Sequence, residues 1–247
     1  MAAPPRSSTS LYFGADRRGR PIDTTLYVAS TWIIPALLAI TMHEAAHGYA
    51  ARRLGDDTAW QLGRVTLNPF KHIDPFGTVA LPALLLMMHA PFLFGYAKPV
   101  PVRFDRLRNP RRDMVWVAAA GPGMNIALAL AAALLLHAAS PLPAPMRVWL
   151  LRNLVNAIEL NVVLAIFNLI PIPPLDGGRV AVGLLPPALA APLARLARYG
   201  MSIVIGLFFI VPILAGATGL HLNLFALVVA RPANALIGGI LWLAGVH

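Results

Sequence analysis

Two histidines and a glutamate lie close together in the sequence, inside a segment apolar enough to cross a membrane. His43 and His47 are four residues apart and Glu44 follows His43, within an apolar run from about Tyr27 to Tyr49. Residues four apart share one face of a helix, so both imidazoles can bind one Zn²⁺ while Glu44 lies beside the metal as a candidate general base. The pattern therefore indicates metal-assisted hydrolysis at membrane depth.

The membrane setting distinguishes this motif from a coincidence. In a soluble helix, two histidines four apart are often surface residues. In hydrocarbon, each ionisable side chain costs about 2.5 kcal/mol or more at the centre of a helix. His43, Glu44 and His47 are clustered in one apolar run, so they need a stabilising partner, and a metal ion supplies one.

A third ligand is expected from the other strong polar signal in the chain. Residues 171–178 read PIPPLDGG and follow an apolar run. The prolines before Asp176 and the glycines after it predict irregular backbone, which is tolerated at membrane depth only beside protein or water. Asp176 is therefore the candidate third ligand, with a surface Asp-Gly-Gly loop as the alternative. The chain has no cysteine, and two histidines with one carboxylate leave the fourth tetrahedral position open, as in catalytic zinc sites.

Two amide side chains are further candidates for the site. Asn168 lies eight residues before Asp176, and Asn125 ends the segment 121–125 with sequence GPGMN. Either amide can hydrogen-bond a substrate backbone or a developing oxyanion, or can tie neighbouring helices together, which is the commoner role of asparagine in membrane helices. His72 and Asp74 are a lesser alternative for metal binding, since both lie in a polar loop.

The composition indicates a polytopic membrane protein. The chain has 247 residues, of which 58% are apolar and 12% charged, and its mean hydropathy is +0.68. Globular chains are about 25% charged. The net charge of +10 is also a property of nucleic-acid-binding proteins. However, most of the basic residues lie between apolar runs, as in cytoplasmic loops near anionic lipid, so we expect the lipid bilayer and no nucleic acid as partner.

The apolar runs predict an all-α polytopic fold with five to six transmembrane helices. Each clear span is near the roughly 20 residues needed to cross a bilayer; these spans are 27–50, 114–138, 153–172, 201–217 and 222–245. The run 76–95 is interrupted by prolines and can either cross the membrane fully or be re-entrant. We expect a re-entrant segment near 76–113. That topology brings Asp176 to the membrane side of the two histidines.

The expected domain organisation is simple. Residues 1–25 form a polar N-terminal segment, and 26–247 form a single membrane-embedded domain with a core at 27–180 and additional helices at 200–247.

The distribution of basic residues predicts the orientation in the membrane. The re-entrant topology gathers many of them on one face, which the positive-inside rule makes cytoplasmic; they are Arg52, Arg53, Arg64, Lys71, Lys98, Arg103, Arg106, Arg108, Arg111 and Arg112. The N-terminal arginines at 6, 17, 18 and 20 fall on the other side and argue against this scheme. We expect a multi-pass protein of the cell membrane with its active site towards the cytoplasm.

The motifs together resemble the site-2 protease family of intramembrane zinc metalloproteases. The resemblance rests on the HExxH motif at 43–47, on Gly121-Pro122 with Asn125, and on Asn168-x-x-Pro171 leading to Leu175-Asp176-Gly177. These motifs cover about 27 to 180, the three helices of the family's catalytic core.

The resemblance implies a function and a role for each site residue. His43, His47 and Asp176 would bind one Zn²⁺ per chain, Glu44 would be the catalytic base, and Asn168 would assist. The implied substrate is a transmembrane helix of another membrane protein. The chain resembles a compact form of the family, with no room for a PDZ domain and nothing at its carboxyl end that looks like a CBS pair. The sequence does not indicate an oligomeric state. A metal-binding membrane transporter and a non-catalytic membrane scaffold are the alternatives, but neither needs a base beside a metal ligand.

Overall fold

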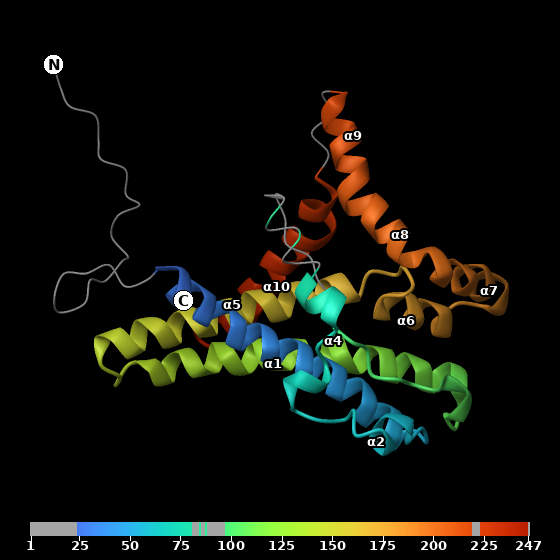
Figure 1. The fold of residues 1–247 in the computed structure, drawn as a ribbon, viewed down its shortest axis with the longest axis horizontal. Coiled ribbons are helices and arrows are strands. Elements are labelled where there is room, and N and C mark those ends of the chain that lie inside the picture. Colours follow the sequence, from blue (N-terminus) through green and yellow to red (C-terminus); the bar gives the residue numbers. More distant parts are fainter. Residues whose placement is uncertain (1–23, 81–83, 85–86, 88–96, 219–222, 247) are drawn as a thin grey trace.

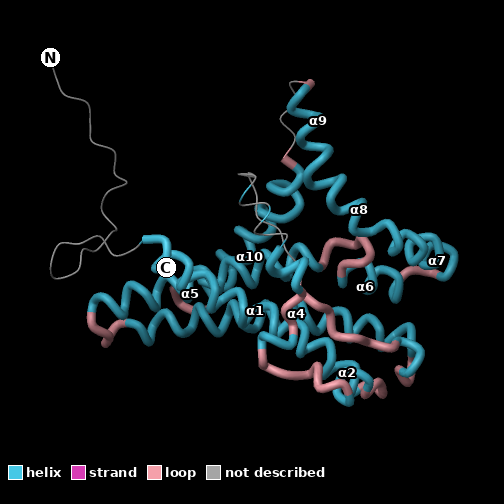
Figure 2. Tube along the Cα trace, in the orientation of Figure 1, coloured by secondary structure: helices cyan, strands magenta, loops and turns pink. Residues whose placement is uncertain are grey.

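Helices and loops make up the part of the chain that can be described, in which no strand occurs (Figures 1 and 2). The computed structural model describes residues 24–80, 84, 87, 97–218 and 223–246. Most of the polar N-terminal segment, and most of the run 76–95 within the expected re-entrant segment, therefore lie outside the described residues. The helices are α1 (Thr24–Arg53), α2 (Thr58–Gln61), α4 (Pro110–Leu135), α5 (Ala144–Asn168), α6 (Asp176–Leu184), α7 (Pro187–Arg195), α8 (Gly200–Ile205), α9 (Val211–Ala217) and α10 (Arg231–Leu243).

Five helical segments among the described residues are long and apolar enough to span a membrane. They are Leu26–Arg53, Pro110–Ala139, Ala144–Asn168, Pro187–Ala217 and Ala226–Leu243. The all-α, multi-pass architecture expected from the sequence is therefore confirmed.

A three-helix core holds the molecule together. Helix α4 packs against α1, α5 and α6, and α1 also packs against α5 (Figure 1). Small residues of α4, including Ala129 and Ala133, are fully buried against Leu154 and Val162 of α5 and against α10. Small side chains let helix backbones approach closely, and dispersion contacts then stabilise the packing inside a membrane.

The bounds of two expected spans were wrong. The span expected at 153–172 is α5, which begins nine residues earlier at Ala144 and ends at Asn168. Arg147 and Arg152 lower the hydropathy of its first turns but are good helix formers, so the helix continues through them. Its end is explained by Pro171, which disfavours helical backbone at the residue before it.

The segment that contains α8 and α9 extends away from the core. The span expected at 201–217 begins at Pro187 and comprises α7, α8 and α9 with short helical turns between them. Figure 1 shows α8 and α9 pointing away from the core. Buried contacts among Ile170, Leu175, Val204, Phe208 and Val229 attach this segment to the turn that precedes α6.

Candidate metal centre

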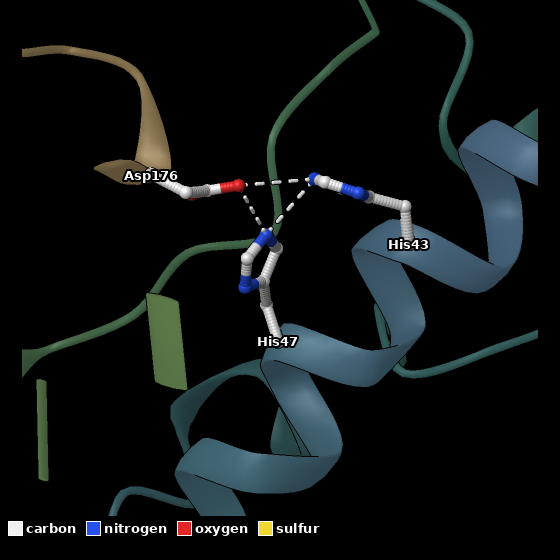
Figure 3. A group of neighbouring side chains, drawn as sticks. All are labelled: His43, His47 and Asp176. Atoms are coloured by element: carbon white, nitrogen blue, oxygen red, sulfur yellow. Dashed lines mark hydrogen bonds and ion pairs between the residues drawn. The ribbon is translucent and has the colours of Figure 1, made fainter. Parts of the chain in front are cut away.

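Three of the expected site residues meet at one point in the core (Figure 3). Oδ2 of Asp176 lies 3.2 Å from Nε2 of His43 and 3.2 Å from Nε2 of His47, and the two Nε2 atoms are 3.1 Å apart. The three side chains are buried, with exposed fractions of 8%, 6% and 5% for His43, His47 and Asp176. The structure thus brings together side chains from α1 and from the first residue of α6.

Hydrogen bonds on the far side of each imidazole fix its tautomer. Nδ1 of His47 lies 2.7 Å from the carbonyl oxygen of Val117, which can only accept, so this nitrogen carries the proton. Nδ1 of His43 lies 2.6 Å from Oδ1 of Asn125, another acceptor. The amide nitrogen of Asn125 donates to Oδ1 of Asn161 at 2.7 Å and to the Ala39 carbonyl at 3.3 Å. Both Nε2 atoms therefore face Asp176 with lone pairs.

This donor set fits a zinc ion. Ligands 2.0–2.1 Å from a tetrahedral ion are about 3.3 Å from one another, close to the edges of the observed triangle. The three atoms that face one another are all acceptors, and within the described residues Oδ2 of Asp176 is buried without a hydrogen-bond partner. A cation at the centre satisfies all three, and this is the one such group of three found in the described part of the chain.

Glycines make room for the cluster. A Cβ on Gly121 of α4 would collide with the imidazole rings of His43 and His47, so α4 can approach α1 this closely only with glycine at that position. A Cβ on Gly177 or Gly178 would run into the backbone of residues 169–173. The glycines after Asp176 therefore let the start of α6 pack against the preceding turn.

The backbone at Asp176 differs from the expectation. The glycines at 177 and 178 were expected to disfavour a helix, yet α6 begins at Asp176 itself. Close packing against residues 169–173 compensates for the low helix propensity of glycine. Asp176 consequently lies at a helix N-terminus, where a negative charge is favoured, and its Oδ1 lies 3.6 Å from a guanidinium nitrogen of Arg179.

The Glu44 carboxylate is half-buried next to the cluster and contacts backbone from a distant segment. Its Oε2 accepts a hydrogen bond of 2.7 Å from the backbone N–H of Val100. A backbone N–H has no distinguishing pattern in the sequence, so the contact between Val100 and Glu44 was not predicted.

The two candidate amides have different positions. Asn125 is fully buried behind His43, where both of its amide hydrogens are donated to protein acceptors. The amide of Asn168 donates to the Leu164 carbonyl in its own helix at 3.0 Å. Among the described residues, no other hydrogen bond of this side chain is found. Asn161 was missed, although an amide in an apolar run is the same signal that drew attention to Asn125 and Asn168.

The lesser metal alternative is not assembled. His72 is buried with Nε2 3.1 Å from the Thr66 carbonyl. The Asp74 carboxylate instead accepts from the backbone N–H groups of Phe76 and Gly77. Both side chains stabilise their own loop.

Comparison with known proteins gives the same family as the motifs. Residues 144–213 match the model of peptidase family M50. The chain is 41% identical over 180 residues to the protein named "Putative zinc metalloprotease YwhC" of Bacillus subtilis, covering 71% of this chain and 78% of that protein. It is 31% identical over 172 residues to the protein named "Putative zinc metalloprotease Rip2" of Mycobacterium tuberculosis, covering 70% of this chain and 64% of that relative. No solved structure matches the chain significantly. This chain therefore belongs to peptidase family M50, the site-2 protease family.

Proposed function

We propose that the chain is a zinc-dependent endopeptidase that hydrolyses a peptide bond in a membrane-spanning segment of another protein. The observation that carries this proposal is the convergence of His43, His47 and Asp176 within 3.2 Å of one another on apolar helices. The family and the zinc metalloprotease names of its relatives support the same activity.

Each residue of the cluster has a defined role. His43 and His47 would hold Zn²⁺ through Nε2, and Asp176 would hold it through Oδ2. The chemistry that zinc would supply there is that of a Lewis acid, which polarises the peptide carbonyl and acidifies the attacking water. Glu44 takes a proton from that water and delivers it to the leaving amine. Asn125 orients His43 from behind, while Asn168 remains our candidate for assisting substrate or oxyanion binding.

The depth of the cluster supports a membrane-embedded substrate. His43 lies ten residues before the end of α1 at Arg53, which corresponds to about 15 Å along the helix. A soluble protein segment would have to enter hydrocarbon to reach the site. A membrane-spanning segment already lies at this depth, provided that its helix opens locally to expose a peptide bond.

The basic residues indicate which side of the membrane the site faces. Arg52 and Arg53 end α1, and Arg111 and Arg112 begin α4, so the site is near a strongly basic end of the core. The positive-inside rule makes this end cytoplasmic. The cysteine-free chain allows a direct test with single cysteines at exposed Arg108 and exposed Ala144 in intact cells. We expect an impermeant thiol reagent to label A144C and not R108C, and the reverse pattern would overturn the orientation.

The catalytic proposal is tested by Glu44→Gln. The purified variant should keep one zinc per chain and lose cleavage of a model membrane-spanning substrate. Glu159→Gln is a matched control, because Glu159 is an exposed residue on apolar α5 and is not part of the cluster. Unimpaired cleavage by E44Q would reject the mechanism, and a metal-free wild-type protein would favour the scaffold alternative.

A further inference from the structure

We infer that the extended segment 98–103, here called the strap, positions the Glu44 carboxylate, and that Arg64 is a positioning residue that holds the strap in place. This inference rests on the proposed role of Glu44 as the base. The strap lies within the segment near 76–113 that was expected to be re-entrant. It precedes α4, and its residues 98–103 have no regular secondary structure.

The sequence of the strap leaves one backbone donor facing Glu44. Pro99 and Pro101 have no N–H, so Val100 supplies the single backbone donor between Lys98 and Val102. This N–H donates to Oε2 of Glu44 at 2.7 Å. Val100 precedes a proline, and this restriction keeps its backbone extended. Such a donor has little freedom to move away from the carboxylate.

The polar segment 54–75, which follows α1, holds the strap on both sides of Val100. Nη2 of Arg64 donates to the carbonyls of Lys98 at 2.9 Å and Pro99 at 3.4 Å. The backbone N–H of Lys98 donates to the His72 carbonyl at 2.9 Å. Beyond Val100, the backbone N–H of Arg103 donates to Oδ2 of Asp56 at 2.6 Å.

Apolar contacts pack the strap against α1, one helical turn after Glu44. The Val100 side chain is 7% exposed. It lies so close to Gly48 that a Cβ there would be 3.1 Å from Val100 Cγ1. Val102 packs against the buried cluster of Ala51, Leu107 and Val117. Packing and hydrogen bonds together thus fix the distance between Val100 and α1.

The consequence is a carboxylate with one oxygen fixed and the other available. Within the described residues, the Val100 N–H is the hydrogen-bond partner of Glu44, so Oε1 is the oxygen that can accept a proton. Holding a base in the productive geometry avoids the entropy loss of ordering it during reaction, and a displacement of 1 Å can lower the rate about 100-fold. The strap therefore acts on catalysis through Glu44 without contacting the metal cluster.

Val100→Pro tests the hydrogen bond directly. This substitution removes the N–H but keeps the extended backbone that Pro101 already imposes. In the full-length protein we expect one zinc per chain, an unchanged KM for a model membrane-spanning substrate and a kcat lowered about 10- to 100-fold. Val100→Ala is the matched variant, because it keeps the N–H and removes buried side-chain atoms. It should lower the thermal unfolding midpoint, yet its kcat should exceed that of V100P about tenfold or more.

Arg64 gives an independent test from outside the strap. Arg64→Ala should lower kcat in the same direction as V100P, again with zinc retained, and Arg64→Lys should restore part of the lost kcat because lysine keeps a charged donor. A structural role alone would change stability or zinc content and would not be reflected in a selective loss of kcat.

Each outcome decides between the hypotheses. A kcat of V100P equal to that of the wild type, with E44Q inactive, would overturn the strap inference and leave the proposed function intact. Loss of zinc from V100P and R64A would also overturn it, because the strap would then maintain the fold or the metal centre. Active E44Q would reject the role of Glu44, and the strap inference with it.

Discussion

His43 on α1 and Asn125 on α4 are joined by a hydrogen bond of 2.6 Å between Nδ1 of the imidazole and Oδ1 of the amide. Asn125 in turn donates to Oδ1 of Asn161 on α5 at 2.7 Å. One line of polar side chains thus crosses the three core helices and ends at an imidazole of the proposed metal centre. The orientation of His43 depends on this line, because a buried imidazole without a partner for Nδ1 has no fixed tautomer.

Replacing Asn161 by leucine should weaken zinc binding, although Asn161 does not contact the metal cluster. Without its partner, the Asn125 amide can rotate, and His43 loses the acceptor that fixes its tautomer. Loss of such a supporting hydrogen bond typically lowers metal affinity about 10- to 100-fold. Zinc competition with a chromophoric chelator measures this effect.

Asn156→Leu is the matched control for this experiment. Asn156 is also on α5 and also hydrogen-bonds a neighbouring core helix, because its amide donates to the Thr31 carbonyl of α1 at 2.9 Å, away from the cluster. This variant should lower the thermal unfolding midpoint and leave the zinc affinity unchanged. Equal loss of zinc from N156L and N161L would mean that helix packing in general, and not the line to His43, determines metal binding.

Gly121→Ala should abolish stoichiometric zinc binding. A single methyl group at this position would overlap the imidazoles of His43 and His47, and a packed helix interface has no space to move the rings aside. Gly123→Ala provides the comparison on the same helix, because its Cβ would meet nothing within 4 Å. Metal analysis of both purified variants decides: G123A should hold zinc at the wild-type level, and full zinc occupancy of G121A would contradict the close approach of α4.

Much of the site was predictable because its chemistry has a sequence signature. The i,i+4 spacing of His43 and His47 fixes a shared helix face, and an acidic residue among prolines and glycines after an apolar run marked Asp176. The expected re-entrant topology then predicted that Asp176 lies on the same membrane side as His43 and His47. The start of α5 was missed because hydropathy counts Arg147 and Arg152 as interruptions, whereas helix propensity does not.

The contacts that orient the site residues were less accessible. Every residue except proline has a backbone N–H, so nothing in the sequence distinguishes the donor at Val100 that contacts Glu44. The sequence left two roles open for Asn125, contact with substrate and contact between helices. Only the position of Asn161 on a neighbouring helix shows which acceptor the Asn125 amide uses there. Long-range pairing of this kind depends on the register between helices, which local patterns do not determine.

Asp56 should make the stability of the strap region depend on pH in the acidic range. Its side chain is fully buried. Burial alone would raise the pKa of this carboxyl, but hydrogen bonds from Thr58 and from the Arg103 backbone outweigh it and lower the pKa below the usual 3.8. A lowered folded-state pKa stabilises the fold above pH 3.8 and ceases to do so as the pH falls through the folded-state value.

Comparison with Asp56→Asn isolates this contribution from that of other carboxylates. We expect the wild type to unfold at a higher temperature than D56N near neutral pH, and the difference between them to shrink below about pH 3.8. Thermal unfolding in detergent over a series of pH values measures it. A difference that stays constant down to the acid limit would show that the Asp56 charge does not stabilise the anchoring of Arg103.

Zinc removal should destabilise the wild-type protein, and Asp176→Asn should largely abolish this dependence. Without a cation, two imidazole lone pairs and a carboxylate oxygen face one another at 3.1–3.2 Å, an arrangement of buried acceptors with no donor. Bound zinc relieves this repulsion and also stabilises the fold by mass action, about 2.7 kcal/mol at a free concentration 100 times the Kd. Chelation should therefore lower the unfolding midpoint of the wild type.

In D176N, the new amide can donate a hydrogen bond to an imidazole nitrogen, so the metal-free form is relieved without zinc and the chelator should have little effect. A chelator shift of the same size in both proteins would contradict the participation of Asp176 in metal binding, because the cluster would then hold its ion without that carboxylate.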